Sequence, residues 1–288
     1  MDPVVSTAWL AANLKAPDLR IVDGTFYLPA EQKNARAEFL ERHIPGAVFF
    51  DIDDIADTTS SLPHMLPSPE KFSSKVRRLG LGDGLRIVVY DSRGGLFSAP
   101  RVRWTFKHFG HPEVAVLDGG LKKWIDEGRP VADGAPSPGE RHFTARANSF
   151  LVRDLAQMQA NLKSKREQVL DARARARFEG SAAELWPGRR AGHIPGSRNL
   201  PYTELANANG TLKSPAELRD LYAKAGIDLA KPVVTTCGSG ITAAVLALGL
   251  EVAGAKNVAV YDGSWAEWGL PEIAGRDERP VATGPAES

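Results

Sequence analysis

Short apolar runs rich in β-branched residues alternate along the chain with segments of helical period. The runs at residues 86–90 and 114–117 are matched later in the chain by runs at 232–235 and 257–261. Strand-like runs separated by helical segments predict a largely parallel sheet covered by helices. The expected fold class is therefore α/β, with mainly parallel sheets flanked by helices.

Two of the helical segments begin with the same local signal. Ser68 and Ser214 are each followed directly by proline. Serine is a favoured N-cap, and proline fits the first helical position because its missing N–H would have no partner there. We expect helices at 68–79 and 214–225.

The chain contains a long internal repeat. His43-Ile-Pro-Gly46 returns as His193-Ile-Pro-Gly196, and the Asp-Gly turn after 114–117 returns after 257–261. A period of roughly 145 to 150 residues indicates a duplicated domain rather than a solenoid.

The segment between the two copies is rich in proline and glycine. Residues 131–139 have no regular hydrophobic period, which is typical of a linker. We place the boundary near residue 145 and expect an N-terminal domain at 1–140 and a C-terminal domain at 150–288.

Composition narrows the class of ligand. The chain has 36 Lys and Arg against 35 Asp and Glu, so its net charge gives no reason to expect nucleic acid or a membrane as a partner. One cysteine excludes an internal disulfide, and the six histidines include no zinc-like pair, so we expect neither a metal nor a cofactor. With no long apolar stretch and no signal-like N-terminus, we expect a cytoplasmic protein that acts on a small molecule.

The single cysteine is the strongest candidate for chemistry. Cys237 lies between a predicted strand and a predicted helix, and Gly238 and Gly240 follow it. Unpaired N–H groups at a helix start can hold a thiolate, and glycines let the backbone curl around the sulfur. Thr242 is a candidate cap for the helix. A lone cysteine is otherwise usually a small buried hydrophobe, but the glycine turn favours a nucleophile.

The first copy lacks the thiol. At a spacing of 145 residues Ser92 falls opposite Cys237, and Arg93-Gly-Gly95 falls opposite Gly238-Ser-Gly240. One catalytic half and one chemically silent half are therefore expected.

These motifs resemble those of tandem rhodanese-type sulfurtransferases, and among them the 3-mercaptopyruvate sulfurtransferases. The resemblance covers residues 21–268, and its most specific part is Cys-Gly-Ser-Gly-Ile-Thr at 237–242. Thiosulfate-specific relatives carry basic residues where this chain has Gly238 and Ser239. The resemblance implies two tandem rhodanese-like domains, with Cys237 as nucleophile and Gly238, Gly240, Ile241 and Thr242 around the substrate.

The same resemblance assigns a substrate arginine. Arg177 precedes an aromatic residue in the matching segment, and a guanidinium fork suits the carboxylate and ketone of mercaptopyruvate. For Arg173 and Arg175 we expect solvated side chains.

A second arginine of the family is missing. Six residues before Gly192 stands Trp186. Either Arg189 or Arg190 replaces it, or one arginine with an aromatic wall holds the donor; Trp186 as an ordinary packing residue is a third reading.

The resemblance also implies a mechanism and a proton relay. A Cys237 persulfide would form with release of pyruvate, and a thiol acceptor, for example a thioredoxin-like protein, or cyanide would remove the sulfur. Asp53, His64 and Ser239 would form the relay if the two domains meet over Cys237, although Asp53 could be a cap and His64 a surface residue.

Other functions fit the sequence less well. Thiosulfate sulfurtransfer is the nearest alternative, and a non-enzymatic rhodanese-like binding or sensing module is a remote one. The glycines after Cys237 also match a dinucleotide fingerprint, but too few residues follow for that domain. A cysteine phosphatase would need arginine where Ala243 stands.

Overall fold

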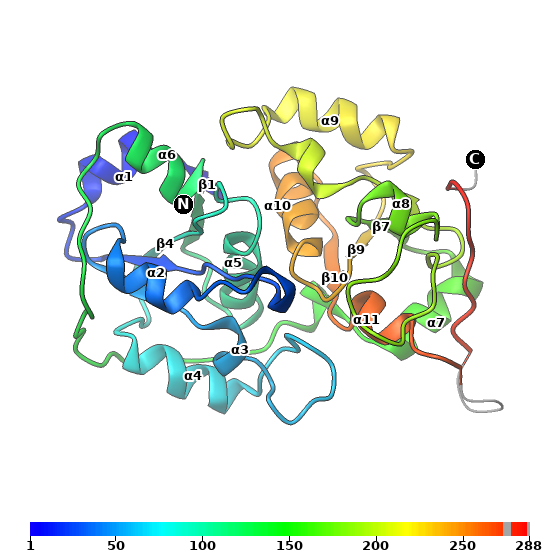
Figure 1. The fold of residues 1–288 in the computed structure, drawn as a ribbon, viewed down its shortest axis with the longest axis horizontal. Coiled ribbons are helices and arrows are strands. Elements are labelled where there is room, and N and C mark those ends of the chain that lie inside the picture. Colours follow the sequence, from blue (N-terminus) through cyan, green and yellow to red (C-terminus); the bar gives the residue numbers. More distant parts are fainter. Residues whose placement is uncertain (273–277, 287–288) are drawn as a thin grey trace. The chain divides into compact units, whose positions relative to one another are not determined.

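The computed structural model describes residues 1–272 and 278–286. These residues form two compact units (Figure 1). Unit 1 comprises 1–59, 66–148 and 206–212, and unit 2 comprises 60–65, 149–205 and the described residues from 213 onward. Each unit thus takes a short segment from the other half of the chain.

Unit 1 alternates strands and helices. Its strands are β1 (Val4–Val5), β2 (Leu19–Asp23), β3 (Ala47–Phe49), β4 (Arg86–Tyr90) and β5 (Val114–Leu117). Its helices are α1 (Thr7–Asn13), η1 (Pro29–Glu31), α2 (Ala35–Glu41), α3 (Ile52–Ile55), α4 (Pro69–Arg78), α5 (Ala99–His108) and α6 (Gly120–Asp126).

Unit 2 repeats this plan. Its strands are β6 (Val152–Arg153), β7 (Gln168–Asp171), β8 (Arg198–Asn199), β9 (Val233–Thr236) and β10 (Val258–Tyr261). Its helices are η2 (Ser149–Leu151), α7 (Leu155–Ser164), α8 (Arg175–Phe178), η3 (Tyr202–Leu205), α9 (Pro215–Lys224), α10 (Ala243–Ala253) and α11 (Ser264–Trp268).

Each unit has one parallel sheet with the same strand order. The orders are β1-β5-β4-β2-β3 and β6-β10-β9-β7-β8, and every pairing between these strands is parallel. The predicted α/β class, with two mainly parallel sheets flanked by helices, is confirmed.

Alternate residues of the strands face two helical layers. In unit 1, Val88 and Tyr90 pack with Leu10 of α1, Phe39 of α2 and Trp124 of α6. On the other face, α5 contacts β4 and β5. In unit 2, α10 packs against β9 and β10, and nine of its eleven residues are buried, as expected of a helix made almost wholly of apolar residues.

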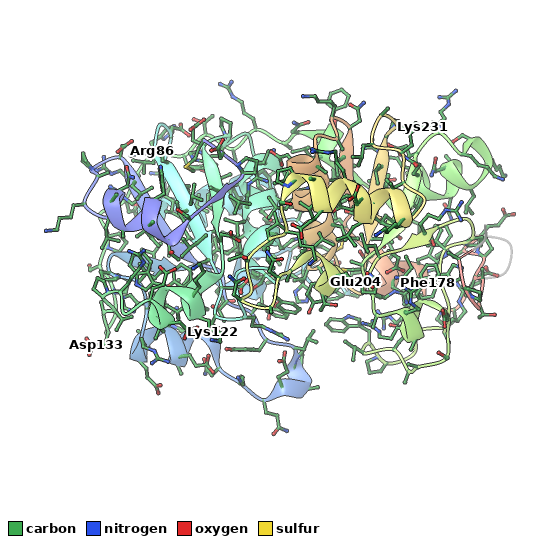
Figure 2. The ribbon with its side chains drawn as sticks, turned by 90° about the horizontal axis from the view of Figure 1, so that it is seen from above. Arg86, Lys122, Asp133, Phe178, Glu204 and Lys231 are labelled. Atoms are coloured by element: carbon green, nitrogen blue, oxygen red, sulfur yellow. The ribbon has the colours of Figure 1, made fainter. Side chains whose placement is uncertain are left out.

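The predicted helix starts are correct. Ser68 and Ser214 are N-caps whose side chains accept from the N–H groups of Lys71 and Glu217. The two histidines of the repeated motif are structural. His43 stacks on Phe39, and His193 stacks on Phe178, labelled in Figure 2, with ring centroids 4.3 and 3.7 Å apart.

The register of the strands corrects the alignment of the two halves. Asp23 of β2 pairs with Tyr90, and its counterpart Asp171 of β7 pairs with Thr236. The residue that follows β4 is Asp91, so Asp91, and not Ser92, corresponds to Cys237. The spacing of 145 placed Val88 opposite Val233, whereas the register places Val88 opposite Val234, so the spacing in these strands is 146.

Candidate active site

The candidate site lies at the carboxyl edge of the sheet in unit 2. Cys237 follows the central strand β9, Asp171 ends the neighbouring β7, and Ser264 follows β10 on the other side. Because all strands are parallel, these ends meet at one edge, where α/β proteins commonly bind ligands.

The loop after β9 wraps its backbone around the thiol. Cys237 is 2% exposed, and its Sγ accepts the N–H of Gly240 at 3.2 Å. Gly240 has φ of +82°, a left-handed conformation that glycine adopts without strain. This N–H would also hold a thiolate or the outer charge of a persulfide.

The chain after β10 fixes the other side of the cysteine. The Cys237 N–H donates to Ser264 Oγ at 3.2 Å, and that hydroxyl donates to the Tyr261 carbonyl at 2.8 Å. The Trp265 N–H donates to the Cys237 carbonyl at 2.9 Å. The backbone of Cys237 is therefore held by the segment that follows β10 as well as by its own strand β9.

Thr242 corrects one expectation. It stands at the N-cap of α10, but its side chain makes no capping hydrogen bond within the described chain. Its φ and ψ of −78° and −14° are helical, whereas a capping side chain needs an extended backbone to reach the first turn. The neighbouring loop residues Ser239 and Ile241 are buried at 5% and 3% exposure.

Arg177 and Trp186 lie against the cysteine loop at Gly238. A Cβ built on Gly238 would be 3.2 Å from Arg177 Nη2 and 3.7 Å from Trp186 Nε1. Glycine at this position thus leaves room for both side chains. The arginine comes from α8 and the tryptophan from the loop after it, so two segments converge on the loop.

Arg173 is not solvated, contrary to the prediction. Its side chain is 1% exposed and donates to Asp171, to Glu184 and to the Gly192 carbonyl. Its guanidinium also lies 4.3 Å from the Trp265 ring centroid. Burial alone would lower the pKa of Arg173, but the two carboxylates and Cys237 raise it above its ordinary value. The side chain of Arg175 is 63% exposed, as expected.

Glu184 joins the two site arginines. Its Oε1 accepts from Arg173 at 2.7 Å, and its Oε2 accepts from Arg177 Nη2 at 2.5 Å. The Glu184 side chain is 3% exposed, whereas that of Arg177 is 16% exposed. Glu184 therefore fixes the orientation of the Arg177 guanidinium, which keeps further N–H groups for a ligand.

Neither of the proposed replacement arginines lies nearest the loop. Arg189 donates to the carbonyls of Ala266 and Pro187, and Arg190 donates to the carbonyls of Trp268 and Arg279. Since the side chains beside Gly238 are Arg177 and Trp186, the geometry favours one arginine with an aromatic wall.

Of the three residues predicted to form a relay, Ser239 lies in the cysteine loop itself and His64 lies beside Trp186. His64 belongs to the segment 60–65 of unit 2, is 6% exposed and contacts Trp186 edge-on with centroids 5.8 Å apart. It is therefore not a surface histidine. Its φ of +60° is unusual for a residue with a side chain. Asp53 lies on α3 in unit 1 and is exposed.

The equivalent loop of unit 1 is filled by its own carboxylate. Asp91 accepts five backbone N–H groups of the following turn, at 2.8 to 3.1 Å, from Arg93, Gly95, Phe97, Ser98 and Ala99. The Asp91 carboxylate thus occupies the nest of N–H groups that could otherwise bind an anion. This explains in physical terms why this half carries no nucleophile.

Sequence reasoning missed Glu184, Ser264 and the buried role of Arg173. The signals were weak, because a glutamate or arginine in a polar loop is usually exposed. Ser264 could have been found from the repeat, because Asp262-Gly-Ser264 aligns with Asp118-Gly-Gly120. In the structure Gly120 and Ser264 both have positive φ, at +57° and +49°.

Comparison with known proteins gives one consistent result. The model of the rhodanese-like domain family matches residues 6–127 and again 154–270. The chain is 45% identical to human 3-mercaptopyruvate sulfurtransferase over 92% of this chain and 91% of that one. It is 43% identical to mouse thiosulfate sulfurtransferase, with the same coverage.

A solved structure agrees with these relatives. SseA of Escherichia coli, described as a 3-mercaptopyruvate sulfotransferase with the rhodanese fold, is 40% identical and superimposes with a TM-score of 0.85, covering 93% of this chain and all of that one. Among the residues described, no helix is both long and apolar enough to cross a membrane.

Proposed function

Since the chain belongs to the rhodanese-like family in both of its halves, we propose that its sulfurtransfer from 3-mercaptopyruvate to a thiol proceeds through a persulfide on Cys237. The chain is a sulfurtransferase, and its substrates are a sulfur donor and a thiol acceptor. The observation that carries the proposal is the Cys237 Sγ, held by the Gly240 N–H with Arg177 beside the same loop.

In the first half-reaction the Cys237 thiolate attacks the sulfur of the donor. The carbon–sulfur bond breaks, and its electron pair stays on carbon as the enolate of pyruvate. The sulfur remains on Cys237 as a persulfide, and the enolate takes up a proton to leave as pyruvate. The N–H groups of the loop stabilise the charge on sulfur at each stage.

Arg177 binds and polarises the donor. Two of its five N–H groups donate to Glu184. The remaining N–H groups of the planar guanidinium would donate to the carboxylate and the ketone oxygen of mercaptopyruvate. The same charge stabilises the enolate as it forms. Trp186 supplies an apolar wall beside the fork.

In the second half-reaction an acceptor thiolate attacks the outer sulfur of the persulfide. The sulfur–sulfur bond breaks, the Cys237 thiolate leaves, and the acceptor carries the new persulfide. We assign the proton movements at the thiol to Ser239, His64 and Asp53, and a buried His64 beside Trp186 supports the histidine in this role. We further propose a thioredoxin-like acceptor and a cytoplasmic location.

Thiosulfate is the second candidate donor. The mouse relative of that name is almost as similar as the human 3-mercaptopyruvate relative, so overall identity does not decide between them. The loop favours mercaptopyruvate, because thiosulfate-specific relatives carry basic residues where this chain has Gly238 and Ser239. A long basic side chain at position 238 would also meet Arg177 here.

The test is steady-state sulfur transfer with both donors in competition. Pyruvate and the sulfur carried by a thiol acceptor are measured for the wild type and for Cys237→Ser. We expect turnover with a clear preference for mercaptopyruvate, and none in the variant. A preference for thiosulfate would overturn the donor, and turnover by Cys237→Ser would overturn the site.

A further inference from the structure

Unit 1 contains a cavity that the sulfur chemistry does not use. Its volume is about 580 Å³, and Asp23, Thr25, Phe39 and Leu121 are among the residues that line it. Asp23 ends β2 and is 2% exposed. We call this cavity the Asp23 pocket.

The pocket lies where unit 2 places a buried arginine. The N–H of Thr25 donates to Asp23 Oδ1 at 2.8 Å, and the N–H of Arg173 donates to Asp171 Oδ1 at 2.9 Å, so Thr25 is the counterpart of Arg173. In unit 2 the Arg173 side chain continues onto the Asp171 carboxylate. Threonine ends before that point, so the Asp23 carboxylate receives no such guanidinium.

Leu121, which lines the pocket, also stands where unit 2 has a larger side chain. The N–H of Leu121 donates to the Asp91 carbonyl, as that of Trp265 donates to the Cys237 carbonyl. Leu121 is therefore the counterpart of the tryptophan whose ring covers the Arg173 guanidinium. Two large side chains of unit 2 are replaced by two smaller ones in unit 1, and the pocket is the space they leave.

The charge at the pocket suits a cation. Glu38 and Glu41 line it with Asp23, and Arg42 is the one basic residue among its described lining. Burial raises the pKa of Asp23 to about 6, and hydrogen bonds from Thr25 and Tyr90 offset only part of this effect. At neutral pH a buried carboxylate thus faces the pocket with incomplete compensation.

We propose that the Asp23 pocket binds a small aliphatic guanidinium compound. The guanidinium group takes the position that Arg173 occupies in unit 2 and pairs with the Asp23 carboxylate through two parallel N–H bonds. The aliphatic chain lies along Phe39 and Leu121, since the volume exceeds what a bare guanidinium fills.

The experiment titrates the full-length protein with butylguanidinium chloride and follows the Thr25 amide by NMR at constant ionic strength. Butylurea is the matched control, because it has the same shape without the charge. We expect saturable shifts of the Thr25 amide with butylguanidinium and at least about tenfold weaker binding of butylurea. Equal responses to the two compounds would overturn the proposal.

Variants separate this pocket from other sites. Thr25→Arg supplies the missing guanidinium from within and should abolish binding, while sulfur transfer stays unchanged. Leu121→Trp should strengthen binding by about threefold or more through the restored ring contact. If Thr25→Arg does not fold, Asp23→Asn gives the test, with an expected loss of at least about tenfold. Wild-type affinity in the folded arginine variant, or in Asp23→Asn, would contradict the assignment.

Discussion

Glu184 is the side chain that gives Arg177 its orientation. It binds Arg173 with one oxygen and Arg177 with the other, and only the second arginine is partly exposed. A buried ion pair network of this kind tolerates the loss of one partner poorly, because a buried charge is left without compensation. Arg177, the proposed substrate arginine, is thus part of a buried ion-pair cluster and not a mobile surface side chain.

Replacing Arg177 should weaken donor binding and turnover. In Arg177→Lys the charge remains but the planar guanidinium is lost. We therefore expect kcat/KM for mercaptopyruvate to fall about ten- to hundredfold, the equivalent of about 1.4–2.8 kcal/mol. Steady-state kinetics measure this. Arg175→Lys, two residues away with an exposed side chain, is the control and should behave as wild type. Equal kinetics for both variants would remove Arg177 from the site.

Asp23 should make the stability of the protein depend on pH. Its folded pKa of about 6 lies above the value of 3.8 for an unperturbed aspartate, so the folded state binds more protons between these values. Stability should therefore fall as pH rises from 4 to 7, by about 3 kcal/mol at most from this group. Asp23→Asn lacks this contribution.

Urea denaturation of both proteins at several pH values checks this expectation. The wild type should lose stability relative to Asp23→Asn as pH rises through 6. Parallel pH profiles for the two proteins would mean that Asp23 is not perturbed.

Among the elements, the strand–loop–helix unit around Cys237 is the one to which we assign the chemistry. The sequence pattern predicted this unit well, since β9 begins and ends only one residue later than expected. Conformation within the loop was harder to predict. Thr242 matches the residue preference of a cap but has helical dihedrals. Ser92 was misaligned because the adjacent valines of the two strands can be matched one residue out of register.

The glycines of the two loops allow a matched test. Gly240 and Gly94 both have positive φ, at +82° and +89°, but only Gly240 donates to the thiol. Alanine should cost about 1–2 kcal/mol of stability at either position. Only Gly240→Ala should also lose most of its sulfur transfer, because its N–H moves away from Cys237. Comparable activity in the two variants would show that this N–H has no part in catalysis.

For the molecule as a whole, duplication gives two units of the same topology with different residues at corresponding positions. Both sheets have the same strand order, but unit 1 has Asp91, Thr25 and Leu121 where unit 2 has Cys237, Arg173 and Trp265. Repeated motifs were enough to predict the duplication. The absence of catalysis in the first half stays a prediction. The motifs could not predict the Asp23 pocket or the buried arginine, because both depend on side-chain volumes that meet only in the folded chain.

A cysteine alone should not activate the first half. We expect Asp91→Cys in the Cys237→Ser background to fold with lower stability, since five N–H groups lose their carboxylate acceptor. It should show no sulfur transfer, because Thr25 stands where Arg173 would be needed. Circular dichroism verifies folding and pyruvate release measures activity; restored turnover would mean that the arginine cluster is dispensable.

The central claim is that Cys237 itself accepts the sulfur. Intact-protein mass spectrometry after incubation with 3-mercaptopyruvate, without an acceptor, tests it directly. The account predicts that the wild type gains the mass of one sulfur atom on Cys237, that cyanide removes it, and that Cys237→Ser gains nothing. Pyruvate release with no added sulfur on Cys237, or an equal gain in the serine variant, would contradict it.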